Sequence, residues 1–186
     1  ETSENCSNFP EESIQSFINY SQRQQILLTN ENAVPLNYLA KKYEVNLLIQ
    51  ATENYIEEYQ NDLPLQILLA YQNDQSFNTE TFENIISRNF ESYINEDQFL
   101  SLNFPIVYRI FGKFYQKRDK TSKLTDEITD FLFKCLTKYG KEASSLFSLI
   151  DACDLTSEKV DILLTKFSDV FDFHFINSSI LKTIYD

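Results

Sequence analysis

The stretch KLTDEITDFLFKCLTKYG, residues 123–140, has the pattern of a single amphipathic helix. Its apolar side chains recur three or four positions apart, as they do on one face of a helix: Ile128, Phe131, Leu132, Cys135 and Leu136. Thr125 stands where an N-cap residue is expected, and Gly140 stands where a C′ glycine belongs. The stretch therefore predicts a helix over Leu124–Tyr139 that buries one face.

The same spacing of apolar residues recurs along most of the chain. It is found in SIQSFINYSQ (13–22), VPLNYLAKKYEV (34–45), NLLIQATENYI (46–56), LPLQILLAYQN (63–73), TFENIISRNFESYI (81–94), DQFLSLNFPIVYRIFGKF (97–114) and LFSLIDACDLTSEKVDILLTKF (146–167). With only 2 Gly and 4 Pro in 186 residues, few positions interrupt these helices. The sequence predicts an all-α fold of stacked antiparallel helix pairs, with roughly ten helices.

Cap residues and prolines mark where several helices begin. Pro64 and Pro105 each suit a first helical turn, where the missing N–H of proline does no harm. Thr79 or Thr81 is expected to cap the helix that follows residue 80. The run Thr156–Glu158 is expected to cap the last long helix.

The remaining segments receive separate predictions. Residues 24–29 (QQILLT) suit an extended connection, and Ala143–Ala152 suits a further helix. The basic run 116–123 (QKRDKTSK) suits a solvated loop tip open to proteolysis, with phosphate binding as the alternative. Residues 179–185 suit one more short helix.

The charge of the chain limits its partners. The formal net charge is −12, from 28 acidic and 16 basic residues. Such a chain repels nucleic-acid phosphates and anionic lipids, because binding to either depends largely on Lys and Arg. We therefore expect a protein partner, and neither nucleic acid nor membrane. The acidic surface serves solubility or the choice of a basic partner.

The few chemically reactive residues do not form a known catalytic or metal-binding pattern. Cys6, Cys135 and Cys153 are isolated, so neither a zinc site nor a thioredoxin-like pair is expected. The single histidine, His174, lies between two phenylalanines and suits a half-buried structural role. Neighbouring carboxylates such as Glu57 and Glu58 point about 100° apart on a helix and suit a solvated face. We expect no catalytic residue, no cofactor and no metal.

Neither a membrane span nor a signal peptide is expected from the sequence. No stretch approaches the ~18 uncharged apolar residues that a membrane span requires. Residues 1–10 lack the basic start and apolar block of a signal peptide. Unpaired cysteines fit a reducing compartment, so we expect the cytoplasm, with the nucleus as a second location.

The order of helices resembles the C-terminal part of a BTB domain followed by a BACK domain. The stretches 13–22 and 34–45 resemble the two helices that close a BTB fold, and 46–56 resembles the helix after them. The stretches 63–73 and 81–94 resemble the first BACK helix pair. Residues 97–111 (DQFLSLNFPIVYRIF) carry the most telling similarity, since BACK domains have a comparable F-L-x-L helix followed by an apolar helix.

The resemblance implies a division of the chain. Residues 1–10 would be a flexible lead-in, 11–60 BTB C-terminal-like helices, 61–167 a BACK-like domain and 168–186 a C-terminal tail. In that family, a β-strand core and further helices precede the matched segment.

The resemblance also implies a function and a set of contact residues. The chain would be a non-enzymatic protein-interaction module or adaptor, with a cullin N-terminal domain of a ubiquitin ligase as the candidate partner. A helical-hairpin scaffold of solenoid type, unconnected with ubiquitin, is the alternative. Carried onto this sequence, the partner groove would include Leu36, Leu39, Tyr43, Tyr55, Tyr59, Leu65 and Tyr71. The 11 tyrosines support an interface role for some of them, because Tyr is enriched at binding hot spots.

Overall fold

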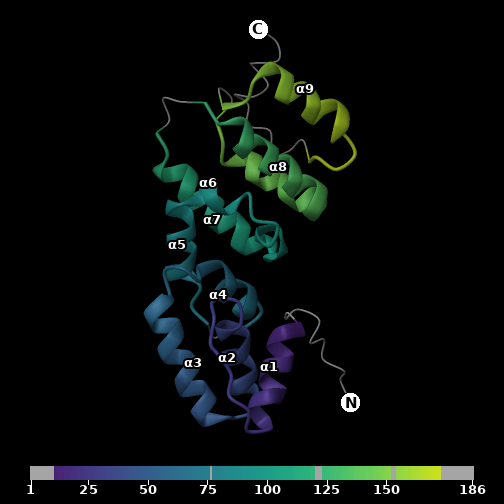
Figure 1. Ribbon diagram of the computed structural model, residues 1–186. Coiled ribbons are helices and arrows are strands. Elements are labelled where there is room, and N and C mark those ends of the chain that lie inside the picture. Colours follow the sequence, from purple (N-terminus) through teal and green to yellow (C-terminus); the bar gives the residue numbers. More distant parts are fainter. Residues whose placement is uncertain (1–10, 76, 120–122, 152–153, 173–186) are drawn as a thin grey trace. The chain divides into compact units, whose positions relative to one another are not determined.

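The computed structural model describes residues 11–75, 77–119, 123–151 and 154–172, and every regular element in these ranges is helical. Nine α-helices occur in the described residues, close to the number expected (Figure 1). They are α1 (Glu11–Ser21), α2 (Ala33–Lys42), α3 (Asn46–Tyr59), α4 (Pro64–Tyr71), α5 (Glu80–Arg88), α6 (Phe90–Tyr93), α7 (Phe104–Lys117), α8 (Asp126–Tyr139) and α9 (Ser157–Lys166), with the 3₁₀ helices η2 (Phe99–Ser101) and η3 (Gly140–Ser148). The all-α prediction is confirmed.

The chain divides into two compact units, Glu1–Ile85 (unit 1) and Ile86–Asp186 (unit 2). The division falls inside α5 and inside the segment 61–167 that the resemblance assigns to one BACK-like domain. The family assignment of the segments stays a prediction. The expected lead-in 1–10 and short helix 179–185 lie outside the described residues.

Unit 1 is built around α2, which is buried along most of its length. Residues 24–29 form no regular element and carry the chain from the end of α1 to the start of α2. The chain then reverses between α2 and α3 through Glu44, whose φ is +56°. Because α2 and α3 run antiparallel, their apolar faces close on one another and on α4 (Figure 1). The resulting core includes Val34, Leu63, Ile67 and Tyr71.

A chain of buried hydrogen bonds joins the three central helices of unit 1. The hydroxyl of Tyr71 on α4 donates to Asn37 Oδ1 on α2 at 2.5 Å. Asn37 Nδ2 donates to Thr52 Oγ1 on α3 at 2.9 Å, and Thr52 Oγ1 donates to the carbonyl of Leu48 at 2.7 Å. Each buried polar group thereby gains a partner, so the three helices are held in one relative position without an unsatisfied side chain.

Tyr71 should make the folded state sensitive to alkaline pH. Burial, assisted by the carboxylates of Glu53 and Asp74, raises the pKa of Tyr71 to about 12. In the unfolded chain a tyrosine titrates near pH ~10, so between these two pH values only the unfolded state loses this proton. Stability is unaffected by this group below pH ~10 and falls as the pH rises from ~10 toward 12. A difference titration of phenolate absorbance against Tyr71→Phe measures the pKa; titration of Tyr71 together with the exposed tyrosines would contradict this assignment.

The core of unit 2 is a cluster of phenylalanine rings centred on Phe90. Its ring centroid lies 4.5 Å from that of Phe114, 5.3 Å from that of Phe131, 5.7 Å from that of Phe111 and 6.0 Å from that of Phe99. Several of these pairs are edge-on or tilted, which is the geometry aromatic rings prefer. The cluster joins α6, η2, α7 and α8, so aromatic residues supply the core volume in a chain without Trp or Met.

Helix ends in unit 2 follow the expected cap residues. The hydroxyl of Thr125 accepts from the backbone N–H of Ile128 at 3.3 Å, and that of Thr156 accepts from Lys159 N–H at the same distance. Gly140 ends α8 with φ +63°, a conformation that a side chain disfavours. In unit 1 Thr79 immediately precedes α5 and donates to the carboxylate of Glu83 at 2.7 Å.

The segment expected to form a helix over Ala143–Ala152 has different bounds and a different helix type in the structure. The structure forms the 3₁₀ helix η3, which starts at Gly140 and ends at Ser148. Two serine hydroxyls within it, those of Ser145 and Ser148, donate to carbonyls three residues earlier. Such side-chain bonds compete with the four-residue repeat of an α-helix and favour the tighter winding.

Candidate functional site

The seven residues predicted to contact a partner all lie in unit 1, but they differ in exposure. Leu36, Leu39 and Leu65 are buried in the core, and Tyr71 is buried with its hydroxyl bound to Asn37. These four side chains hold the helices together and present almost no surface.

The other three predicted residues reach solvent to different degrees. Tyr55 and Tyr59 are half-buried and their rings lie 4.6 Å apart, with the Tyr55 hydroxyl donating to Asn30 Oδ1 at 2.9 Å. Tyr43, at the end of α2, is 56% exposed. The structure thus brings Tyr55 and Tyr59 together on α3, while Tyr43 stands at the other end of that helix pair.

Three large apolar side chains are exposed on helix ends of unit 1: Ile18 in the last turn of α1, Tyr43 at the end of α2 and Leu47 at the start of α3. We call these three residues the unit 1 patch. Ile18 is 40% exposed and Leu47 is 75% exposed. The last turn of α1, the end of α2 and the start of α3 lie at the same end of the unit (Figure 1). The ring of Phe17 lies 5.4 Å from that of Tyr43 and fixes α1 against α2 there. Large apolar side chains left exposed on neighbouring helix ends are a feature of interaction surfaces.

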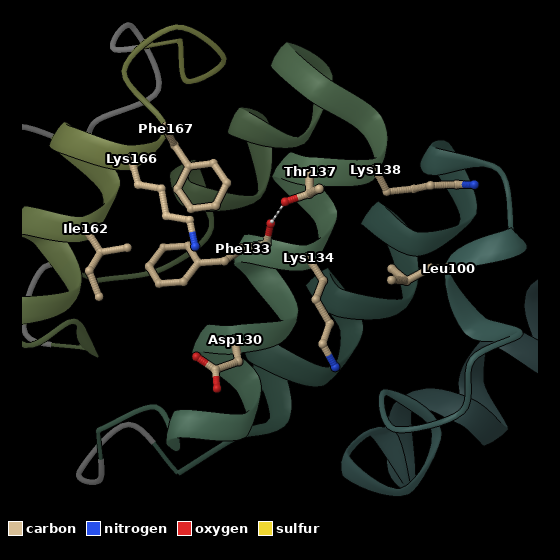
Figure 2. Close-up of a pocket in the computed structure, with 9 residues that line it drawn as sticks. All are labelled: Leu100, Asp130, Phe133, Lys134, Thr137, Lys138, Ile162, Lys166 and Phe167. Atoms are coloured by element: carbon tan, nitrogen blue, oxygen red, sulfur yellow. Dashed lines mark hydrogen bonds between the residues drawn. The ribbon is translucent and has the colours of Figure 1, made fainter.

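A second candidate surface is a groove in unit 2, shown in Figure 2, with a volume of about 630 Å³. Its walls come from α8, from α9 with the residue after it, and from η2. Apolar side chains and lysines share the lining: Leu100, Asp130, Phe133, Lys134, Thr137, Lys138, Ile162, Lys166 and Phe167. We call it the α8–α9 groove.

The apolar part of the α8–α9 groove is formed by packed rings. Phe133 and Phe167 stack with their centroids 5.3 Å apart and their planes 20° apart. At the far side, the hydroxyl of Tyr139 lies 2.9 Å from the carbonyl oxygens of Leu100 and Leu102 and ties that turn to α8. Burial raises the pKa of Tyr139, so the hydroxyl stays a donor at ordinary pH. The groove is therefore shaped by contacts within unit 2.

Of the charged residues that line the groove, only the aspartate has an ion-pair partner among the described residues. Asp130 already binds Lys159 Nζ at 3.0 Å, and this hydrogen bond raises the pKa of Lys159. Lys134, Lys138 and Lys166 make no ion pair with any residue that the structure describes. The groove thus combines an aromatic floor with three lysine ammonium groups that no carboxylate of the described residues pairs.

A third cluster is polar but closed. Asp154 accepts from the Tyr115 hydroxyl and binds Arg118 Nη1 at 2.9 Å, and the side chains of Arg118 and Asp154 are only 8% and 4% exposed. The N–H of Asp151 donates to the Tyr115 oxygen at 2.8 Å. Burial and the bond to Asp154 raise the pKa of Tyr115, which keeps it protonated. Because the Arg118 and Asp154 side chains are nearly enclosed and bind each other and Tyr115, the cluster acts as an internal brace for unit 2.

The remaining residues considered for chemistry form no site among those that the structure describes. Burial raises the pKa of the Cys135 thiol, so a thiolate is not formed at ordinary pH. Across the described ranges, no three His, Cys, Asp or Glu side chains come together as metal ligands would. His174, Cys6 and Cys153 lie outside the described residues.

The sequence-based prediction of contacts included Tyr43 of the unit 1 patch, but it included neither Leu47 nor any residue of the α8–α9 groove. Phe133 lies one position off the buried stripe of its helix, and Leu47 precedes the buried Leu48. An apolar residue beside, rather than on, a helical stripe was the available signal in both cases.

No protein-family model, curated protein or solved structure matches the chain. None of the described helices combines the length and apolar character that crossing a bilayer requires.

Proposed function

We propose that the chain is a non-enzymatic protein-interaction module of the adaptor type. The observation that supports this is the unit 1 patch, where Ile18, Tyr43 and Leu47 are all exposed at one end of a helical unit. A partner that covers these side chains removes apolar area from water, the main favourable term in protein association. Tyr43 is the one predicted contact residue that the patch contains.

The resemblance to BTB–BACK proteins suggests the partner to test. That partner is the N-terminal domain of a cullin, and we expect the interaction to take place in the cytoplasm or nucleus. The rigid core of unit 1, with its buried Tyr71–Asn37–Thr52 hydrogen bonds, suits a module that presents a fixed surface.

Charge insertion at Leu47 tests the proposal. We expect Leu47→Asp to weaken binding of the whole chain to a cullin N-terminal domain by roughly tenfold or more, because a buried anchor is replaced by an unpaired charge. Binding is measured by pull-down and by calorimetry. Leu47 is mostly exposed in the free chain, so the helical circular dichroism and the melting temperature should change little.

A matched control adds the same charge elsewhere on α3. Asn54 is exposed and lies about two turns further along the helix. Asn54→Asp should bind as the unaltered chain does. If Leu47→Asp bound with unchanged affinity, the unit 1 patch would not be the contact surface; if the unaltered chain bound no cullin domain, the cullin-adaptor role would be removed.

A further inference from the structure

We propose that the α8–α9 groove binds an acidic, amphipathic segment of a partner protein. The segment would place one or two bulky apolar side chains on the stacked rings and its carboxylates against the lysines. All lining residues belong to unit 2, so this site does not depend on the unit 1 patch or on a cullin partner.

The floor of the groove favours an apolar anchor. Phe133 and Ile162 are half-buried, so each keeps part of its apolar side chain open to the groove. The Thr137 hydroxyl already donates its hydrogen to the Phe133 carbonyl at 3.1 Å, so that hydrogen is not free for a ligand (Figure 2). The floor thus offers preformed apolar area, and an aliphatic or aromatic side chain of a partner would gain most from covering it.

The charges around the floor select an acidic occupant. The whole chain carries net −12, yet this groove carries three lysines and one aspartate. The aspartate is engaged by Lys159, whereas Lys134, Lys138 and Lys166 have no carboxylate partner in the described residues. A carboxylate-bearing segment would meet complementary charge here and repulsion over most other surfaces, which directs it to this place.

The spacing of the lysines suits a helical partner. Lys134 and Lys138 are one turn apart on α8, so their Cα atoms are separated by about 6 Å along the axis. Lys166 approaches from α9, and its ammonium lies 5.9 Å from the centroid of the Phe167 ring (Figure 2). A helix with Glu or Asp at positions i and i+4, flanking a bulky apolar residue, matches this arrangement.

Other occupants are less consistent with the same charges. Nucleic acid and anionic lipid both require a broad basic surface, and this groove offers three lysines on a chain whose net charge is −12. A second copy of the chain is acidic and could contribute a segment of its own. These occupants give distinct results in the experiment below.

The test is a selection of binding peptides from a displayed library of random 16-residue sequences, with the whole chain as bait. We expect the enriched peptides to be acidic, with carboxylates about one turn apart beside an apolar residue. Their affinity should fall by roughly tenfold or more when the bait carries all three substitutions Lys134→Glu, Lys138→Glu and Lys166→Glu. Their affinity for the unaltered chain should also weaken as salt is added. Ile162→Ser should also weaken binding, which separates the apolar contribution from the charges.

A matched control changes the same type of charge elsewhere in unit 2. Lys117 is exposed at the end of α7 and does not line the groove. Lys117→Glu should leave the affinity of the selected peptides unchanged, and the circular dichroism and melting temperature of every variant confirm folding.

Several results would overturn the proposal. They are the enrichment of no peptide, enrichment of peptides without acidic residues, and equal binding by the triple variant and the Lys117→Glu control. Binding to phosphatidylserine vesicles or a DNA duplex in preference to the peptides would also overturn it. So would a dimer that sedimentation shows to be lost in the triple variant, because the groove would then hold a second copy.

Discussion

Replacement of Asp154 by alanine is expected to lower the free energy of unfolding by about 3–5 kcal/mol. The substitution leaves the guanidinium of Arg118 buried without its carboxylate, and it removes one of the two carboxylate acceptors of the Tyr115 hydroxyl, the other being Asp151 Oδ2. Arg118 Nη2 is already buried without a hydrogen-bond partner within the described part of the chain, so the substitution adds to a group that is incompletely satisfied. Urea denaturation followed by far-ultraviolet circular dichroism measures the loss.

A paired substitution separates the charge effect from the loss of packing. With Asp154→Leu and Arg118→Met together, no charge is left buried, and most of the lost stability should return. If Asp154→Ala cost less than about 1 kcal/mol, the Tyr115–Arg118–Asp154 cluster would not be the brace of unit 2 described above. If the double variant were as unstable as the single one, the loss would come from packing instead.

Truncation of Phe90 to alanine is expected to lower the free energy of unfolding by about 3–5 kcal/mol. Phe90 is fully enclosed, and its ring touches the rings of Phe99, Phe111, Phe114 and Phe131. Removing it opens a cavity at the point where α6, α7 and α8 meet. Differential scanning calorimetry should show a lower melting temperature, by more than about 10 °C for a unit of this size.

Two comparisons make the Phe90 result specific. Phe90→Leu keeps most of the volume, and should cost clearly less than Phe90→Ala. Phe114→Ala removes a ring of the same cluster that is only half-buried, and should also cost less. Equal losses at Phe90 and Phe114 would show that the cluster does not depend on a central ring.

Local features of the fold were predictable because the forces that set them act within one or two turns. The spacing of apolar residues predicted α2 and α8 to within about two residues at each end and identified the segments that form α3 and α7. Thr125 and Gly140 were expected at the ends of α8 because capping and a positive φ depend on side chains close in sequence. For the same reason the all-α class followed from a sequence with little Gly or Pro.

Contacts between distant residues could not be predicted in the same way. Asn37 bonds to Thr52 and Tyr71, which lie 15 and 34 positions away, and nothing in the spacing of these residues specifies that pairing. The predicted contact residues had the same difficulty. A helical stripe identifies an apolar face, but whether that face meets another helix or a partner depends on tertiary packing, which buried Leu36 and Leu65.

The ring cluster around Phe90 also affects the transient opening motions of the unit 2 core. A half-turn of the Phe90 ring about its Cβ–Cγ bond sweeps out space that four neighbouring rings occupy. The flip can occur only when those neighbours briefly move apart. The exchange broadening of the Phe90 aromatic resonances therefore reports the rate of such openings.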